Sequence, residues 1–431
     1  MDGREGPISV GIRNGRVAVL APYDAPVEAH AVVELAHDEV LLPGLVDTHV
    51  HVNEPGRTDW EGFDTATRSA AAGGVTTIVD MPLNSIPPTT TIAGLEEKQE
   101  VAREQIWVDV GFWGGAVPGN LAELEKLHEA GAFGFKCFLL DSGVEEFPHL
   151  TPREFGAALA ETARLGALML VHAEDADLID ESHAHGSAYS GFLDSRPSAA
   201  EERAIDLVID GARASGGRAH IVHLSAAGAI PALRAARSEG VDVSVETCPH
   251  YLFFDAEAIP DGATEFKCCP PIRDAANRSG LWAGLAAGDI DFVVSDHSPC
   301  VAELKKQELG DFGDAWGGIA SLQLGLPAVW TMAREHGHGL ADVTRWMASG
   351  PADRVGLTDR GRIAVGAAAD LCVFAPEEDF VVDVASLHHK NPVSAYAGRT
   401  LTGTVRQTWL RGAPVDLDAA PRGRLLRRGE A

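Results

Sequence analysis

Side chains that can bind a metal ion lie at or near the ends of several short apolar runs in the sequence. They are His49, His51, Lys136, His172, His223 and Asp296. Neutral imidazoles and carboxylates suit zinc or another divalent first-row ion. A lone buried histidine is more often a packed core residue than a ligand. A set of candidate ligands spread over five separate runs instead indicates one shared site, and predicts a metal-dependent hydrolase.

Lys136 is the unusual member of this set, because an ammonium group is a cation with no free lone pair. It becomes a ligand if its amine is carboxylated by carbon dioxide, which gives an anionic group able to bridge two metal ions. We therefore expect two divalent ions and an N6-carboxylated Lys136. Zinc is the first candidate, and manganese, cobalt and nickel are alternatives that the same ligands accept.

The elements that must position these residues are eight apolar runs, separated by helical or loop sequence. The runs are 45–51, 75–82, 108–115, 134–139, 168–172, 220–224, 243–248 and 290–295. Helical patterns at 151–165 and 201–214 lie between them. Near-continuous apolar strands that alternate with helices predict an α/β fold with a closed (β/α)8 TIM barrel, whose active site lies at the carboxyl ends of its strands. A doubly wound open sheet would need a glycine-rich turn where His49-Val50-His51 stands.

Both ends of the chain have β character instead. The strand-like runs are 8–10, 16–20, 31–35, 363–365, 370–374, 380–382 and 404–409. We expect residues 1–44 and 362–431 to pair into one small β-sandwich domain, and residues 45–361 to form the barrel catalytic domain.

Composition excludes several classes of protein. The 431 residues carry a formal net charge of -28, which disfavours nucleic acid and anionic membrane as partners. There is no apolar stretch of about twenty residues, no apolar core in residues 1–6, and no CxxC pair among the six cysteines, so we expect a cytoplasmic protein. We interpret the arginines at positions 422, 424, 427 and 428 as a frayed, solvated terminus.

The run from Pro43 to His51 resembles the opening of the cyclic amidohydrolases in the amidohydrolase superfamily. The resemblance implies that His49 and His51 bind one ion and that His172 and His223 bind the other. It also implies that carboxylated Lys136 and a hydroxide bridge the two ions, that Asp296 is a further ligand to the first, and that the protein is a homotetramer.

Two departures narrow the choice within this family. Dihydroorotases have an arginine where this chain has Asn53, and an amide cannot replace a guanidinium in binding a carboxylate. Hydantoinases and dihydropyrimidinases have a tyrosine where this chain has Asp141. The segments that resemble the allantoinase branch are 51–63, 111–115, 135–144, 315–320 and 389–394. This resemblance implies ring opening of allantoin to allantoate in purine and ureide catabolism. The alternatives are a hydantoinase or dihydropyrimidinase, or a non-catalytic structural homologue.

We assign the proton transfers to Asp296, as general base and then general acid. The resemblance places Cys269 and Gly317 where main-chain groups bind the substrate ring. Asn53 and Ser142 are expected to supply further polar contacts with the substrate. His250 and His297, which lie near the ends of strands, are interpreted as residues that orient ligands.

Overall fold

The computed structural model describes residues 5–430 of the chain. Met1–Arg4, which belong to the segment predicted to contain no signal sequence, lie outside the described residues, as does Ala431. Within the described range, no helix is both long and apolar enough to cross a membrane.

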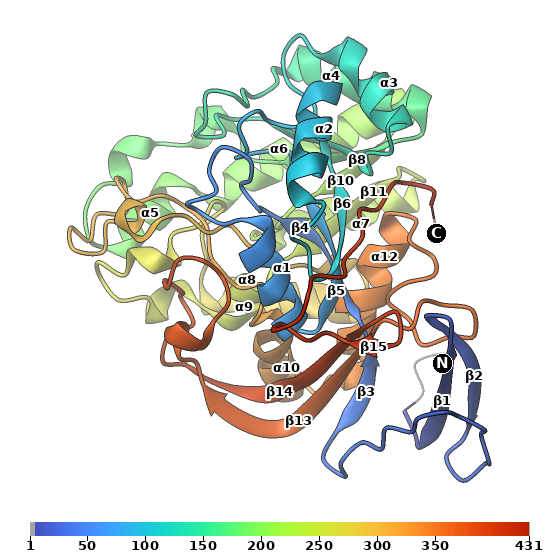
Figure 1. Ribbon diagram of the computed structural model, residues 1–431. Helices are drawn as coiled ribbons and strands as arrows, with labels where there is room; N and C mark the ends of the chain where they lie inside the picture. The colour runs from blue at the N-terminus through green and yellow to red at the C-terminus, as the bar shows by residue number, and fades with distance from the viewer. Residues whose placement is uncertain (1–4, 431) are drawn as a thin grey trace.

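Parallel strands form the centre of the molecule (Figure 1). They are β4 (Leu45–Val50), β5 (Val75–Asp80), β6 (Asp109–Phe112), β7 (Gly114–Gly115), β8 (Gly134–Phe138), β9 (Leu168–His172), β10 (Arg218–Ile221), β11 (Val243–Thr247) and β12 (Phe292–Val293). Each pairs with its neighbour in the chain, except that β6 and β7 are two halves of the predicted run 108–115. A parallel bridge between Val50 and His297 joins the last strand to the first. The ring is closed, so the predicted (β/α)8 barrel is confirmed.

The alternation of side chains along the strands determines which residues face the barrel interior. In β9, Met169 and Val171 pack in the core between the strands and the helices. Leu168 and Leu170 belong to a separate cluster on the other face. Because side chains two residues apart share a face of a strand, His172 lies on the same face as Leu168 and Leu170. That apolar cluster fills the barrel beneath the carboxyl edge where His172 ends its strand.

Helices alternate with the strands and cover the barrel. They are α1 (Phe63–Ala72), α2 (Ile92–Ala102), α3 (Leu121–Glu129), α4 (Pro152–Leu165), α5 (Tyr189–Ser195), α6 (Ser198–Ser215), α7 (Ile230–Ser238), α8 (Pro249–Phe253), α9 (Ala275–Ala287), α10 (Gly325–Glu335), α11 (Leu340–Thr344) and α12 (Gly350–Arg354). The predicted helices at 151–165 and 201–214 correspond to α4 and α6. Helix α4 begins with a capping box between Thr151 and Glu154 and ends at the left-handed Gly166, so its sequence encodes both ends.

Strands from both chain ends form a second, smaller β unit beside the barrel (Figure 1). Its main sheet has the order β15 (Ala413–Pro414), β14 (Thr400–Leu410), β13 (Leu371–Val381) and β3 (Val40–Pro43). A hairpin of β1 (Ile8–Arg13) and β2 (Arg16–Pro22) forms a second sheet, and a bridge between Arg16 and Ala368 ties it to the late part of the chain. The two ends therefore meet as predicted, whereas the exact domain boundaries remain a prediction.

The prediction of a strand is wrong for two of the runs near the chain ends. The runs 31–35 and 363–365 are not strands in the structure. Val32 and Val33 are 82% and 62% exposed, and Val365 is 64% exposed. Valine favours strands only where a pleated, half-buried surface receives its side chain, and these three valines are too exposed to have such a surface.

The arginine-rich C-terminal tail is not frayed, which corrects a second expectation. The Val110 amide donates to the Arg424 carbonyl at 2.9 Å, and the Leu426 amide donates to the Val110 carbonyl at 2.8 Å. The Arg428 guanidinium donates to the His128 carbonyl at 2.8 Å. The tail thus lies along β6 as an added strand-like segment. The spacing of its arginines gives no sign of this pairing, because the contacts are made mainly by its backbone.

Candidate active site

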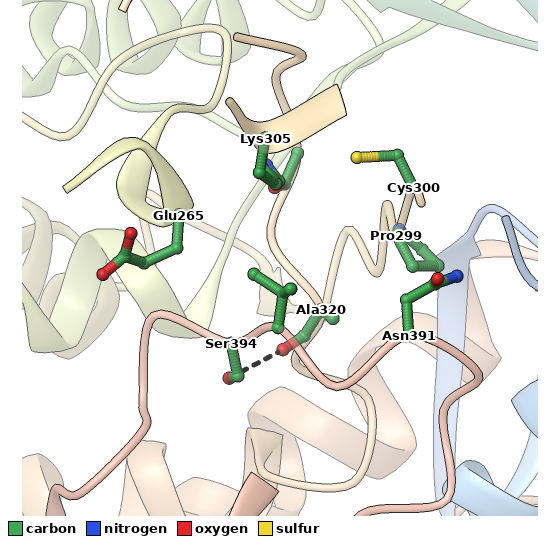
Figure 2. A pocket seen from close by; sticks show the side chains of 9 residues that line it. Glu265, Pro299, Cys300, Lys305, Ala320, Asn391 and Ser394 are labelled. Carbon is green, nitrogen blue, oxygen red and sulfur yellow. Dashed lines mark hydrogen bonds between the residues drawn. The ribbon is translucent and has the colours of Figure 1, made fainter. Parts of the chain in front are cut away.

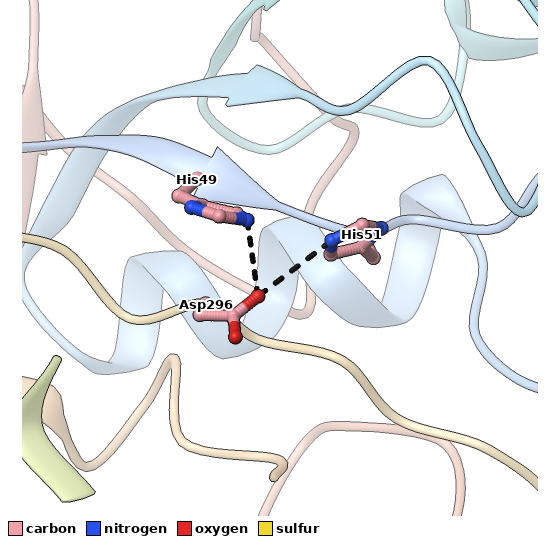
Figure 3. A group of neighbouring side chains, drawn as sticks. All are labelled: His49, His51 and Asp296. Carbon is pink, nitrogen blue, oxygen red and sulfur yellow. Dashed lines mark ion pairs between the residues drawn. The ribbon is translucent and has the colours of Figure 1, made fainter. Parts of the chain in front are cut away.

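Three predicted ligands form one compact cluster at the carboxyl edge of the barrel. His49 Nε2 lies 3.1 Å from Asp296 Oδ1, and His51 Nε2 lies 3.6 Å from the same oxygen (Figure 3). All three side chains are buried, and one potential ligand atom from each lies within 4.8 Å of the others. His49 belongs to β4 and His51 follows it directly, while Asp296 follows β12, the neighbouring strand in the closed ring.

The other three predicted ligands lie directly beside this cluster. Lys136 Nζ, on β8, is 3.3 Å from His49 Nε2. The ring centroids of His49 and His223 are 5.4 Å apart, and those of His223 and His172 are 4.6 Å apart. The His172 ring also stacks on Phe138 at 4.7 Å. The structure therefore brings all six residues together, although the role of each remains a prediction.

Burial leaves His51 and His223 suited to bind a cation, whereas the nearby Asp296 and Glu246 carboxylates outweigh burial at His49 and raise its pKa. Burial lowers the pKa of His51 and of His223 well below the ordinary histidine value, helped by the positive charge of Lys136 at His51 and by His172 at His223. Burial also lowers the pKa of Lys136 to about 8. Neutral rings offer a free lone pair, and the Nδ1 atom of His223 is buried with no hydrogen-bond partner among residues 5–430. This donor set fits a divalent metal ion.

Three candidate site residues adopt the left-handed backbone conformation, which side chains other than glycine rarely adopt. Their φ angles are 65° for Asn53, 42° for His223 and 45° for Asp296. Each such residue costs on the order of 1 kcal/mol or more, a strain that persists where the surrounding structure enforces it. All three residues follow the carboxyl end of a barrel strand. The left-handed conformation therefore changes the direction of the chain at the edge of the barrel where the predicted ligands meet.

Glu246, on β11, is a residue of the site that sequence reasoning missed. Its Oε1 lies 2.5 Å from His49 Nδ1 and its Oε2 lies 2.9 Å from His220 Nε2, with 1% of the side chain exposed. Burial alone would raise its pKa, but His49 and His220 lower the pKa of Glu246 to about 2. The carboxylate is therefore ionised and fixes the orientation of the His49 ring. A lone glutamate inside an apolar run was the only available sign of this role.

Glu174 plays the equivalent part for the second histidine pair. Its Oε2 lies 2.8 Å from His172 Nε2 and accepts a hydrogen bond from Arg196 Nη1 at 3.0 Å. Burial opposes ionisation, but Arg196 and His172 lower the pKa of Glu174 to about 2. Glu174 lies two residues beyond His172, so its spacing could have identified it. Arg196 directly follows α5 (Tyr189–Ser195), and no local pattern in the sequence points to it.

The two predicted main-chain substrate contacts are neighbours in the structure. A side-chain carbon placed on Gly317 would lie 3.6 Å from Cys269 Sγ and 3.9 Å from the Cys269 nitrogen. The loop that carries Gly317 and the segment that carries Cys269 thus face the same space. At the next residue, φ is 120° and an added Cβ would lie 2.3 Å from the Ser298 oxygen, so Gly318 admits no side chain.

The two predicted polar side-chain contacts are already engaged within the protein. The Asn53 amide donates to the Pro299 carbonyl at 3.1 Å and accepts from Asn84 Nδ2 at 3.1 Å. The Ser142 hydroxyl lies 2.6 Å from the Phe147 carbonyl oxygen, to which it can donate. Substrate binding by Asn53 and Ser142 remains a prediction. Both side chains also have a structural role, since they hold the loops beside the site.

His250 and His297 flank Asp296 in different ways. His250 is fully buried, and neither of its ring nitrogens has a hydrogen-bond partner among the described residues. His297 lies 3.1 Å from Glu61 Oε2 through Nε2, and its Nδ1 accepts from the Ser321 amide at 3.2 Å. His297 therefore fixes the backbone that follows Asp296, and its side chain does not join the ligand cluster.

Comparisons with known proteins agree with this geometry. The model of the amidohydrolase family matches residues 40–415. An allantoinase from Streptomyces avermitilis is 54% identical over 98% of this chain and 95% of its own length. An allantoinase from Saccharomyces cerevisiae is 51% identical over 88% of this chain and 83% of its own length.

Solved structures show the same architecture. The L-hydantoinase (dihydropyrimidinase) from Arthrobacter aurescens has a TM-score of 0.91 and 30% sequence identity, covering 98% of this chain and 96% of its own. The dihydropyrimidinase from Brevibacillus agri has a TM-score of 0.88 and 28% identity, covering 98% and 95%. Together with the buried ligand cluster, these relatives support divalent metal binding. The chain belongs to the amidohydrolase family and, within it, groups with the allantoinases.

Proposed function

We propose that this protein hydrolyses allantoin to allantoate, opening the hydantoin ring between the imide nitrogen and its carbonyl. The observation that carries the proposal is the convergence of four histidines, a lysine and an aspartate from five barrel strands on one buried cluster. The identity to relatives named allantoinase, 54% for the one from Streptomyces avermitilis, supports the choice of substrate. A place in purine and ureide catabolism follows from that substrate.

The ligand set supports two divalent ions, with zinc as the first candidate. His49, His51 and Asp296 would hold one ion, and His172 and His223 would hold the other. Lys136 lies 3.3 Å from His49 Nε2, and as an ammonium group it would repel both ions. Carboxylation would turn it into an anionic bridging ligand, which removes that conflict. When bound, the ions would polarise the substrate carbonyl and lower the pKa of water from about 16 toward 7.

The chain's own residues would then carry the proton and hold the ring. Asp296 accepts the proton that the attacking water releases as its oxygen bonds to the ring carbonyl carbon. It returns that proton to the ring nitrogen as the carbon–nitrogen bond breaks, which yields a carboxylate and a free amide nitrogen. The main-chain groups of Cys269 and Gly317 would bind the ring. Trp60 and Trp316, whose rings pack edge to face at 5.1 Å, would limit the access of bulk water.

Replacing Asp296 by asparagine tests this proposal. The amide keeps a ligand oxygen but cannot carry the proton, so we expect most of the metal to remain and kcat to fall by at least about a hundredfold. Asp210→Asn, at a side chain that is 75% exposed, is the matched control. Near-normal turnover of Asp296→Asn, with metal content verified by elemental analysis, would overturn the assigned role.

The substrate itself is tested by comparing ring opening of allantoin, hydantoin, dihydrouracil and dihydroorotate on one preparation. We expect allantoin to have the highest kcat/KM. Preference for hydantoin or dihydrouracil would favour the alternative activity of the solved structural neighbours. A metal-free protein with no turnover would instead favour the non-catalytic alternative.

We also propose a homotetramer, and the cytoplasmic location stays a prediction. Support for assembly comes from the exposed side chains of Val32 (82%), Val33 (62%) and Tyr23 (59%), the last of which donates a hydrogen bond at 3.0 Å to Glu34, the residue after Val33. Exposed apolar surface of this kind is typical of contacts between subunits. Light scattering of the purified protein measures the assembly directly, and a monomeric mass would contradict it.

A further inference from the structure

Two lysines form hydrogen bonds with the loop 313–318, which contains Gly317, one of the predicted substrate contacts. The first is Lys267, whose ammonium group donates to the Gly313 carbonyl at 3.1 Å and to the Ala315 carbonyl at 2.6 Å. The same group lies 5.4 Å from the centre of the Phe192 ring. Lys267 precedes Cys268 and Cys269, so it connects the two segments that face the substrate space.

The second lysine is Lys305, which holds the other half of the loop 313–318. Its ammonium group donates to the Trp316 carbonyl at 3.0 Å and to the Gly318 carbonyl. Figure 2 shows Lys305 lining a small cavity beside the loop, together with Pro299 and Cys300. Between them the two lysines bind four carbonyl groups of this one loop.

Charge and burial show that these contacts are not ordinary surface interactions. Lys305 is only 4% exposed. Neither Lys267 nor Lys305 forms an ion pair with a carboxylate within the described residues 5–430. A cation that is wholly or partly removed from water without a counter-ion is costly, and carbonyl dipoles are the groups that satisfy the buried Lys305 and the partly buried Lys267. Burial lowers the pKa of both lysines, which agrees with this environment.

The main chain of Gly317 is left open by this arrangement. The amide of Trp316 donates to the Leu304 carbonyl at 2.8 Å, and the amide of Gly318 donates to the Lys267 carbonyl at 2.9 Å. In contrast, neither the amide nor the carbonyl of Gly317 has a partner within residues 5–430, and the residue is only partly buried. One free donor and one free acceptor therefore stand side by side, the pair that a ring N–H and C=O unit can satisfy.

Lys305 also acts on the strength of that free donor. The Trp316 carbonyl and the Gly317 amide belong to the same peptide unit. An ammonium group bound to the carbonyl oxygen draws electron density toward it and makes the amide hydrogen of the same unit a better donor, because linked hydrogen bonds polarise one another. The lysine thus affects a substrate contact without touching the substrate.

We propose that Lys267 and Lys305 are positioning residues that lock the loop 313–318 and present the free main-chain groups of Gly317 to the substrate ring. The inference rests on the proposed function for the identity of that ring. The restraint of the loop 313–318 by the two lysines does not depend on the substrate and can be measured without turnover. Lys306, which is exposed and follows Lys305 directly, provides a matched control.

The experiment compares Lys305→Met, Lys267→Met and the control Lys306→Met in the metal-loaded protein. Methionine keeps the length of the side chain and removes the ammonium group. For the first two variants we expect KM for allantoin to rise about tenfold, the scale of one hydrogen bond to a charged group, with kcat changed by less than about threefold. Metal content should stay unchanged. Hydrogen exchange of a peptide spanning the loop 313–318 should become faster, and Lys306→Met should match the wild type in every measurement.

Each outcome decides the proposal. Unchanged exchange and unchanged KM in both variants would overturn it, and so would a loss of metal in parallel with kcat, since that indicates general damage to the fold. If Lys305→Met does not fold, the partly exposed Lys267→Met still gives the answer. Faster exchange in a protein that does not hydrolyse allantoin would support the lock and reject the proposed function, so the two failures are distinguishable.

Discussion

Replacing Glu246 tests whether a residue that contacts a predicted ligand, but is not itself a ligand, contributes to metal affinity. For His49 to offer its Nε2 lone pair to a metal, the ring hydrogen must be on Nδ1, which lies 2.5 Å from Glu246 Oε1. Glu246→Gln removes the charge but keeps one acceptor for that hydrogen. The new amide NH2 group can donate to His220 Nε2 when the hydrogen of the His220 ring is on Nδ1. That tautomer has a partner, because His220 Nδ1 lies 2.6 Å from the Ser244 hydroxyl oxygen and can donate to it. Glu246→Ala removes the acceptor as well.

The expected magnitudes follow from these contacts. A hydrogen bond to a charged group is about twice as strong as a neutral one, so Glu246→Gln should weaken metal binding about tenfold, or about 1.4 kcal/mol. Glu246→Ala leaves the ring without its partner and should weaken binding about a hundredfold, or about 2.8 kcal/mol. Both effects are expected at a side chain that is 1% exposed, where water cannot replace the carboxylate.

The assay is competition for the metal between protein and a chelator, with the bound metal measured by elemental analysis. Glu239→Gln is the matched control, because that glutamate is 54% exposed and pairs with Arg213 away from the site. Wild-type affinity in both Glu246 variants would refute the claim that this carboxylate orients His49. Equal losses in the glutamine and alanine variants would refute the argument from the tautomer of His220.

Three further predictions concern the metal, a buried ion pair and the tail. Removing metal with a chelator should abolish allantoate formation. Adding zinc, manganese or cobalt should restore the activity, and more fully with bicarbonate than without it. Recovery that does not depend on bicarbonate would contradict carboxylation of Lys136. Lys98→Met should lower the free energy of unfolding by about 3–5 kcal/mol in urea titrations, because it leaves Asp80, fully buried and 2.7 Å from the ammonium group, without its partner; the exposed Lys126→Met should change it little. Truncation after residue 420 should lower the melting temperature measurably, since Gly423, Arg424 and Leu426 form backbone hydrogen bonds with the segment 106–110; an unchanged melting temperature would show that the tail adds no stability.

Several barrel strands were predictable because they carry a strong local signal, whereas β10 (Arg218–Ile221) and β12 (Phe292–Val293) differ from the predicted runs 220–224 and 290–295 by two or more residues at each end. The run 168–172 matches β9 residue for residue, and β4, β8 and β11 agree with their runs to within one residue at each end. Terminal strands were harder to predict. The runs 31–35 and 363–365 have the composition of strands but do not form strands, whereas the tail pairs with β6 without having the composition of a strand. Pairing between distant segments, which decides both cases, leaves no mark on a short stretch of sequence.

The sequence by itself determined the set of predicted metal ligands that the structure brings together. Side chains at the carboxyl ends of parallel barrel strands must converge, so His49, His172 and Asp296 could be placed together from their positions alone. Only the tertiary structure decided what holds them. Glu246 contacts His49 because β11 and β4 belong to one closed ring, and Lys305 reaches the Trp316 carbonyl through the folding of a loop. Such contacts depend on strand register, ring closure and side-chain rotamers, which the complete packing of the chain sets and no local spacing records.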